Sequence, residues 1–116
     1  SKEIRCTATY DNPLTVQMNE SLARTLITNL LKNAYLHTAK NSHIAITVTN
    51  RTLTIANDGE TPLDAEHIFE RFYQGAKKQG STGLGLALAD AIGKYYRLQI
   101  AYDFYGKQHR FSVTWP

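Results

Sequence analysis

Two asparagines and a histidine are spaced four residues apart in the first long apolar segment of the chain, at Asn29, Asn33 and His37. In a helix this spacing places the three side chains along one side, where they flank the apolar stripe. Asparagine is a poor helix former and a buried amide needs hydrogen-bond partners, so two of them in one helix favour a functional role. The amide oxygen of asparagine is a hard, neutral ligand, which suits a Mg²⁺ ion that already carries nucleotide phosphates and water.

A glycine-rich stretch, residues 80–86, offers chemistry of a second kind. Gly80, Gly83 and Gly85 give a backbone that can reach positive φ and lie close to a ligand. The apolar residues that follow recur at helical spacing, so the glycines open a helix. The start of a helix carries unpaired N–H groups and a partial positive charge, which suits a phosphate. Taken alone, the stretch fits a phosphate-binding turn and a turn that merely caps a core helix equally well.

Apolar periodicity predicts the two helices that carry these residues. The first is predicted to begin after Asn19, a favourable N-cap residue, with Glu20 in its first turn, and to run to about His37. Its apolar residues form one stripe at helical spacing. They are Leu22, Ala23, Leu26, Ile27, Leu30, Leu31 and Ala34. The glycine-opened helix is predicted to run to about Tyr96.

Strand periodicity accounts for most of the remaining chain. Strands are predicted over residues 4–9, 44–48, 53–55, 98–104 and 109–115, with a further short extended piece at 14–17. Turns at 50–51 and 105–107 join two pairs of strands into hairpins. Loops are predicted at 57–62 and 74–82, with a short helix at 64–72 between them. Hairpins are antiparallel and helices must pack on a sheet face, so the order predicts an α/β fold, a two-layer sandwich with its helices on one face.

The length and composition indicate one globular domain, residues 1–116, with 42% hydrophobic and 20% charged residues. The net charge of +3 fits an anionic ligand, but lysine and arginine are scattered, so no nucleic acid is expected as a partner. The single cysteine, Cys6, cannot form an internal disulfide and fits a reducing compartment. No apolar run is long enough to span a membrane, and no signal peptide follows Ser1, so no membrane contact is expected of the domain itself.

Four short motifs occur in order along the chain. They are Asn29-Leu30-Leu31-Lys32-Asn33-Ala34, Asn57-Asp58-Gly59, Ile68-Phe69-Glu70-Arg71-Phe72-Tyr73 and the stretch from Gly80 to Leu86. In this order they resemble the asparagine box, first glycine box, phenylalanine box and second glycine box of the GHKL superfamily, most of all its histidine kinase branch. The resemblance extends from about Met18 to the last residue. It implies the Bergerat fold, with a mixed, mostly antiparallel sheet, and the binding of ATP with Mg²⁺.

The resemblance assigns roles residue by residue. Asn33 matches the asparagine that ligates Mg²⁺. Asn57 stands where the family usually has an aspartate that accepts a hydrogen bond from the adenine amino group; its amide oxygen can do the same, and Gly59 keeps the backbone close to the base. Phe69 and Tyr73, together with Phe72, match aromatics that anchor a lid. The residues that the resemblance places at the lid and the phosphates are Lys77, Lys78, Gly80, Ser81, Thr82, Gly83, Leu84, Gly85 and Leu86.

The aperiodic loop at 74–82 is expected to be the lid, which nucleotide would order, with Gly80 and Gly83 as hinges. The alternative is a permanently flexible surface loop in which Lys77 and Lys78 are simply solvated. The aromatic cluster could likewise be part of the core.

Three positions depart from the family pattern. Thr61 replaces the second glycine of the first glycine box, and Leu36 stands where many of the kinases have a basic residue for the phosphates. His37 takes the place of a common tyrosine near the base and keeps a flat ring there. None of these changes removes the nucleotide site, but Leu36 weakens the case for tight phosphate binding.

Hydrolytic members of the superfamily, such as topoisomerase and mismatch-repair ATPases, carry a glutamate four residues before the metal-binding asparagine, where it activates water as general base. Here that position is Asn29, whose neutral amide cannot take a proton. Slow hydrolysis is therefore expected, which favours a phosphotransferase. In histidine kinases the acceptor histidine is followed by glutamate or aspartate. None of the four histidines here is followed by an acidic residue. The residues that follow them are Thr38, Ile44, Ile68 and Arg110.

The chain is thus identified as a histidine kinase catalytic domain, an enzyme in which Asn29 and Asn33 are the candidate catalytic residues. The resemblance implies transfer of the ATP γ-phosphoryl group to a histidine on the separate dimerisation domain of a parent kinase, with a response regulator downstream. It also implies a cytoplasmic domain of a membrane-anchored bacterial sensor. Two alternatives remain open: an anti-sigma-factor-type serine kinase, and a degenerate nucleotide-binding module that acts only as a scaffold.

Overall fold

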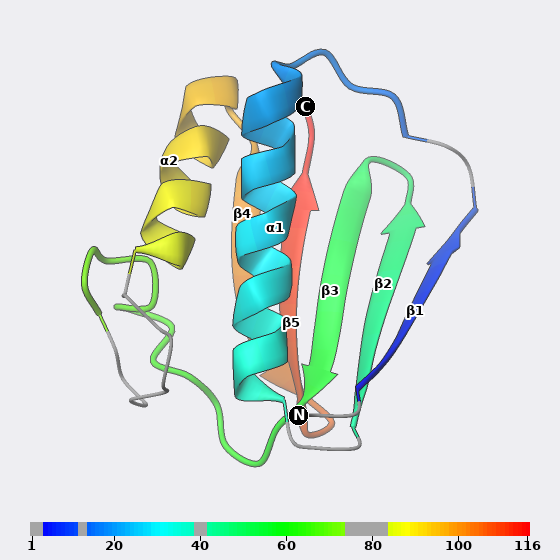
Figure 1. Cartoon of the computed structure of the whole chain (residues 1–116), viewed down its shortest axis with the longest axis vertical. Helices are drawn as coiled ribbons and strands as arrows, with labels where there is room; N and C mark the ends of the chain where they lie inside the picture. Colours follow the sequence, from blue (N-terminus) through cyan, green and yellow to red (C-terminus); the bar gives the residue numbers. More distant parts are fainter. Residues whose placement is uncertain (1–3, 12–13, 39–41, 74–83) are drawn as a thin grey trace.

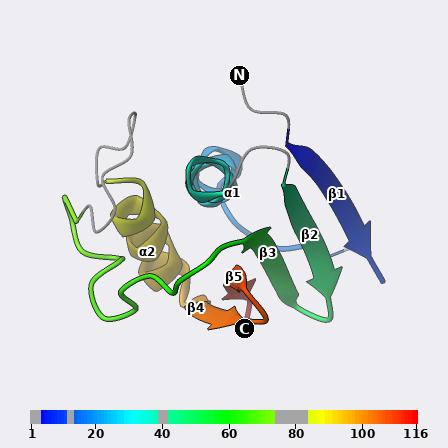
Figure 2. The same cartoon turned by 90° about the horizontal axis from the view of Figure 1, so that it is seen from below.

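The computed structural model describes residues 4–11, 14–38, 42–73 and 84–116. Its elements, in chain order, are β1 (Arg5–Tyr10), α1 (Glu20–His37), β2 (His43–Thr49), β3 (Thr52–Asp58), α2 (Gly85–Tyr96), β4 (Gln99–Tyr105) and β5 (Gln108–Thr114). The strands form one sheet in the order β1-β2-β3-β5-β4, in which β1 and β2 run parallel and all other neighbours run antiparallel. Both helices cover the same face (Figures 1 and 2). The predicted two-layer sandwich with a mixed, mostly antiparallel sheet is therefore confirmed.

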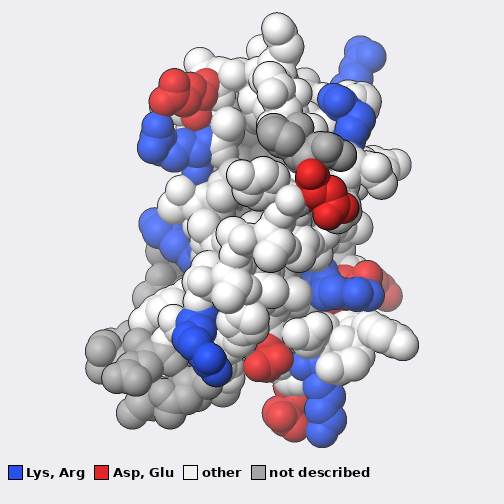
Figure 3. Space-filling model, turned by 90° about the vertical axis from the view of Figure 1, so that its right-hand side faces the viewer, with Lys and Arg blue, Asp and Glu red and all other residues white. Residues whose placement is uncertain are grey.

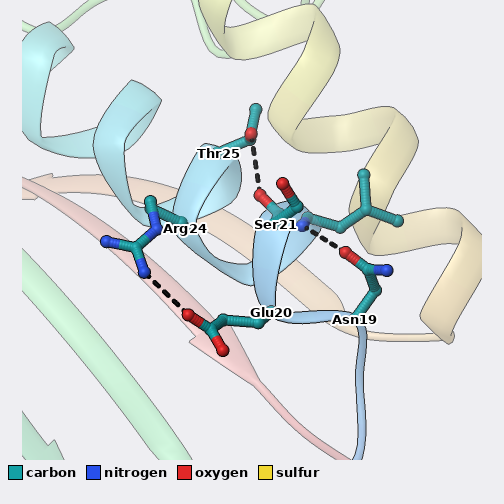
Figure 4. A network of polar contacts seen from close by, with 6 residues as sticks. Asn19, Glu20, Ser21, Arg24 and Thr25 are labelled. Carbon is teal, nitrogen blue, oxygen red and sulfur yellow. Dashed lines mark hydrogen bonds and ion pairs between the residues drawn. The ribbon is translucent and has the colours of Figure 1, made fainter.

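The first helix begins where its capping residue predicts. Oδ1 of Asn19 accepts a hydrogen bond of 3.0 Å from the backbone N–H of Leu22, which has no partner within the helix. Glu20 lies in the first turn, where its charge complements the helix dipole, and it pairs with Arg24 at 2.8 Å (Figure 4). Both members of this pair are largely exposed, so the cap and the apolar face contribute more to the position of α1 than the ion pair does.

The core lies between α1 and the central strands. Leu26, Leu30 and Ala34 point from one side of α1 and are at most 1% exposed. They pack in one cluster with residues of β3 and β5 that are equally buried, among them Ile55 and Phe111. Because side chains alternate along a strand, every second residue of β5 turns toward the helices. This alternation decides which side chains of β5 lie in the layer between the sheet and the helices.

Both predicted hairpins are present, and their turns explain why. Asn50 has a φ of 55° between β2 and β3. Gly106 and Lys107, between β4 and β5, have φ values of 60° and 58°. Two successive left-handed residues make the turn type whose twist matches that of the strands, and glycine adopts the first of these conformations without strain.

Three segments differ from the prediction. Residues 14–17 form no strand; they run as an irregular connection in which Leu14 and Val16 pack against the core. β3 continues to Asp58, so Asn57 belongs to the sheet instead of a loop, because it pairs with His109 of β5. Residues 64–72 form successive turns, not a helix.

Local hydrogen bonds explain the turns at 64–72. The carbonyl of Asp64 accepts from the N–H groups of both His67 and Ile68, while its carboxylate accepts from the N–H of Glu66. Such side-chain bonds to nearby backbone compete with helix formation. Phe72 ends the segment with a φ of 63°, and so short a stretch cannot offset the cost of nucleating a helix.

In the part of the chain that the structure describes, the face of the molecule that carries β1 shows no basic stripe (Figure 3). On the face that carries β1, lysine and arginine are interspersed with aspartate and glutamate (Figure 3). Among the described residues, neither helix has the length and apolar character that a crossing of a bilayer demands.

Candidate functional site

Asn29 connects the two helices. Its Nδ2 donates a 2.9 Å hydrogen bond to the carbonyl of Thr25, one turn earlier in α1, which leaves Oδ1 directed at the start of α2. A Cβ placed on Gly85 would lie 3.1 Å from that Oδ1. The close approach explains a glycine as the first residue of α2. The structure thus brings together the asparagine row and the glycine-opened helix, which are far apart in the sequence.

Two asparagine side chains at the same end of the molecule each carry one buried atom that has no partner among the described residues. The C-terminal half of α1 and the C-terminal end of β3 both lie there (Figure 1). Within the described part of the chain, no partner is found for Nδ2 of Asn33 or for Oδ1 of Asn57. Nδ2 of Asn57 donates to the carbonyl of Asp58 at 3.3 Å, so its unpaired atom is an acceptor. A buried polar atom without a partner costs about 1–3 kcal/mol, so two of them here indicate that a ligand supplies the partners.

His109, which the sequence motifs did not include, lies beside Asn57. The two residues are directly paired between β3 and β5, and His109 is 4% exposed. Its Nδ1 lies 2.8 Å from the hydroxyl of Tyr102 on β4, and that hydroxyl accepts the backbone N–H of Leu63 at 2.8 Å. The sequence signal for His109 is its spacing: it lies two residues before Phe111, so in a strand both side chains point to the same, buried face.

Burial sets the protonation of this pair. Desolvation lowers the pKa of the His109 imidazole, which keeps the ring neutral, and desolvation raises the pKa of the Tyr102 phenol, which keeps the hydroxyl protonated. The hydroxyl oxygen accepts from Leu63, and in the tautomer of the neutral ring that carries its proton on Nε2 the hydroxyl donates to Nδ1. A chain of hydrogen bonds therefore links Leu63, Tyr102 and His109.

Other predicted site residues lie around this end and along the core. His37, the last residue of α1, is half-buried. Phe69 meets the ring of Phe111 edge-on, with 6.1 Å between centroids, and both Phe69 and Tyr73 pack against the core. Desolvation raises the pKa of the Tyr73 hydroxyl.

The remaining predicted residues belong to the lid and the start of α2. Leu84 is exposed and Leu86 packs against the core. Six residues and the predicted lid at 74–82 lie outside the described part of the chain. These six are Lys77, Lys78, Gly80, Ser81, Thr82 and Gly83.

The turns at 64–72 contain a pH-sensitive pair. Nδ1 of His67 lies 2.6 Å from Oδ2 of Asp64, and this hydrogen bond raises the pKa of His67 and lowers that of Asp64. The folded state therefore favours the charged ring of His67. The resulting contribution to folding stability is complete below the ordinary histidine pKa of 6.5, and it is lost as the pH rises through the raised pKa.

An NMR titration should therefore place the pKa of His67 above 6.5. In Asp64→Asn, which removes the charge and leaves an acceptor of similar shape, the pKa of His67 should fall back toward that value. An unshifted pKa in the wild-type chain would show that the pair does not form in solution.

Known proteins of similar sequence include sensor histidine kinases. Residues 18–116 match the family model described as histidine kinase-, DNA gyrase B- and HSP90-like ATPase. The sensor histidine kinase RppB of Synechocystis is 35% identical over 84% of this chain, and the sensor histidine kinase HprS of Escherichia coli is 32% identical over 82%. This chain covers 24% of the first relative and 23% of the second, so it spans about a quarter of their length.

Solved structures agree on the fold. The catalytic domain of the histidine kinase ThkA, in a nucleotide-free form, superimposes with a TM-score of 0.87 at 24% identity, covering 97% of this chain and 78% of that one. A mycobacterial sensor histidine kinase, MprB, gives 0.83 at 20% identity, covering 97% and 83%. At these identities the likeness establishes the architecture.

Proposed function

The chain belongs to the family of histidine kinase-, DNA gyrase B- and HSP90-like ATPases, and on that premise we propose that residues 1–116 form the ATP-binding catalytic domain of a sensor histidine kinase. The observation that carries this proposal is Oδ1 of Asn57, an acceptor that is buried at the end of β3 and has no partner in the part of the chain that the structure describes. It is supported by the curated relatives, several of which are sensor histidine kinases.

Asn57 has the chemistry to select adenine. The exocyclic amino group of adenine is a donor, and the Asn57 oxygen is an acceptor without a partner among the described residues. Guanine presents a carbonyl oxygen at the corresponding position, which would set acceptor against acceptor. A site built around a buried hydrogen bond rejects a ligand that cannot make it, because the protein group then stays unpaired. Gly59, two residues later, lets the backbone lie close to the base.

The described residues fit Mg²⁺ only if most of its ligands come from elsewhere. They contain no group of three histidine, cysteine, aspartate or glutamate side chains that could hold a metal. Mg²⁺ in nucleotide sites commonly takes one or two protein oxygens and completes its shell with phosphates and water. Asn33 supplies one such oxygen if its amide turns, because rotation by a half-turn exchanges the amide nitrogen and oxygen. We assign Asn33 as this ligand.

The environment of Asn29 favours transfer over hydrolysis. Its amide is held by the carbonyl of Thr25 and faces Gly85, and a neutral amide cannot take a proton from water. Phosphoryl transfer depends mainly on positioning and charge neutralisation. The acceptor histidine is then on the dimerisation domain of the parent kinase, with a response regulator as the downstream partner and the cytoplasm as the compartment.

Calorimetry with ADP, ATP and GTP tests the nucleotide site. With Mg²⁺ present, both adenine nucleotides should bind and GTP should bind at least about tenfold more weakly. Asn57→Leu, which keeps the side-chain volume, should lose a similar factor for ADP. Asn33→Ala should weaken binding in Mg²⁺ but match the wild type in EDTA, which serves as its internal control. Equal affinity for GTP would contradict the assignment of Asn57.

The kinase assignment is decided by the same protein with ATP labelled on its γ-phosphate. Alone, the chain should remain unlabelled and release little phosphate. Added to the dimerisation domain of its parent kinase, it should place an acid-labile label on that domain. An acid-stable label would instead identify a serine kinase, and nucleotide binding without any transfer would identify a scaffold.

A further inference from the structure

We propose that Tyr102 and His109 are positioning residues for the nucleotide site: together they hold the backbone of residues 59–63 beside Asn57. The inference rests on the proposed function, because this backbone follows the proposed adenine acceptor directly. Neither residue belongs to the four motifs, and both come from the last hairpin of the chain, β4 and β5.

The first contact is steric. Gly59 follows β3 directly, and its N–H donates to the carbonyl of Lys107 at 2.9 Å, so the backbone stays attached to the hairpin. A Cβ on Gly59 would lie 2.1 Å from Nε2 of His109 and 2.4 Å from Cδ2. The imidazole therefore occupies the space where a side chain would be, and the backbone at 59 lies against the ring. The ring serves as a wall that sets how far this backbone can move toward β5.

The second contact is the hydrogen bond at the other end of the segment. The Tyr102 hydroxyl accepts the N–H of Leu63 at 2.8 Å. The same hydroxyl lies 2.8 Å from Nδ1 of His109, and the two rings are stacked, 5.9 Å apart at 29°. Residues 59 and 63 are thus held by two side chains that also hold each other. Hydrogen bonds in such a chain polarise one another, so the loss of one weakens the next.

This arrangement fixes a loop that would otherwise be free to move. The segment between Gly59 and Leu63 is otherwise exposed, with Glu60, Thr61 and Pro62 at the surface. A loop that is ordered before the ligand arrives does not lose that freedom on binding, so affinity is higher. The pair thus acts on nucleotide affinity through the backbone next to Asn57.

Tyr102→Phe tests the inference, because it removes one oxygen and keeps the ring. ADP binding should weaken roughly tenfold, and hydrogen exchange at the Leu63 amide should accelerate by a similar factor. The matched control is Tyr105→Phe, the same substitution on the same strand at an exposed site, which should change neither quantity. Affinity is measured where thermal melting shows each variant to be fully folded, so a merely structural role would lower the melting temperature and leave the affinity unchanged.

His109→Leu is the second variant, and it should lose the same factor because the acceptor for the hydroxyl is gone. His109→Asn, which offers an amide oxygen in place of Nδ1, should recover part of the affinity. Combined with Tyr102→Phe, His109→Leu should add little further loss, since the two residues act as one unit. Full ADP affinity in folded Tyr102→Phe would overturn this inference alone. A wild-type chain that binds no adenine nucleotide would overturn the proposed function and this inference with it.

Discussion

Phe111→Ala is expected to destabilise the domain by about 3–5 kcal/mol, a large part of the stability of a typical small domain. Phe111 is 1% exposed in the middle of β5. Its ring meets Tyr102 at 4.9 Å and Phe69 at 6.1 Å, between centroids, so it supports both the last hairpin and the phenylalanine motif. Truncation leaves a cavity that neither neighbour can fill without leaving its own contacts.

Urea unfolding followed by circular dichroism measures this loss. The matched control is Phe104→Ala on β4, whose side chain is only partly buried, so the same truncation should cost clearly less. Equal losses for the two variants would mean that the core is not centred on β5. Phe111→Leu should fall between the wild type and Phe111→Ala, because it keeps most of the apolar volume.

Gly59→Ala is expected to have the second largest effect, and it acts on stability and on the site together. The added Cβ would lie 2.1 Å from a buried imidazole that Tyr102 holds in place, so either the ring or the β3 end must move. Overpacking of this kind costs about 1–3 kcal/mol. Nucleotide affinity should fall as well, because the displaced backbone follows Asn57.

Gly106→Ala provides the contrast for this variant. No atom of the described residues lies within 4 Å of a Cβ at that position, so the expected cost comes from the φ of 60°. It should lose about 1 kcal/mol of stability and keep full nucleotide affinity. Thermal melts and calorimetry on both glycine variants separate the two causes. If Gly59→Ala binds nucleotide as the wild type does, the contact between this backbone and His109 is not required for the site.

Local rules predicted the elements that depend on neighbouring residues. The start of α1 follows from Asn19, and the turns of both hairpins follow from residues that accept positive φ. The failures have a different cause. The loop predicted at 57–62 loses its first residues to β3, because pairing with β5 extends the strand. No periodicity within a segment reports the presence of a partner strand fifty residues away along the chain.

The candidate site likewise contains residues that sequence motifs predict and contacts that they do not. Asn33 and Asn57, which remain proposed site residues, were predicted from the sequence because they belong to motifs of recognisable spacing. The contact of Asn29 with Gly85, and the chain from Leu63 through Tyr102 to His109, join residues that meet only after the sheet has formed. A histidine on a strand predicts little by itself.

The alternation of buried and exposed side chains along β5 limits which sequence changes the domain can accept during evolution. His109 faces the helices only because its parity matches that of Phe111 and Val113. Insertion or deletion of one residue within the strand would turn the residues beyond it to the opposite face, exchanging buried side chains for ones such as Arg110 or Ser112. Substitutions can therefore alter the site one residue at a time, whereas gains and losses of length are tolerable only in the connections. Even within the connection from Gly59 to the start of α2, the contacts of Leu63 with Tyr102 and of Phe69 with Phe111 limit where such a change of length can fall.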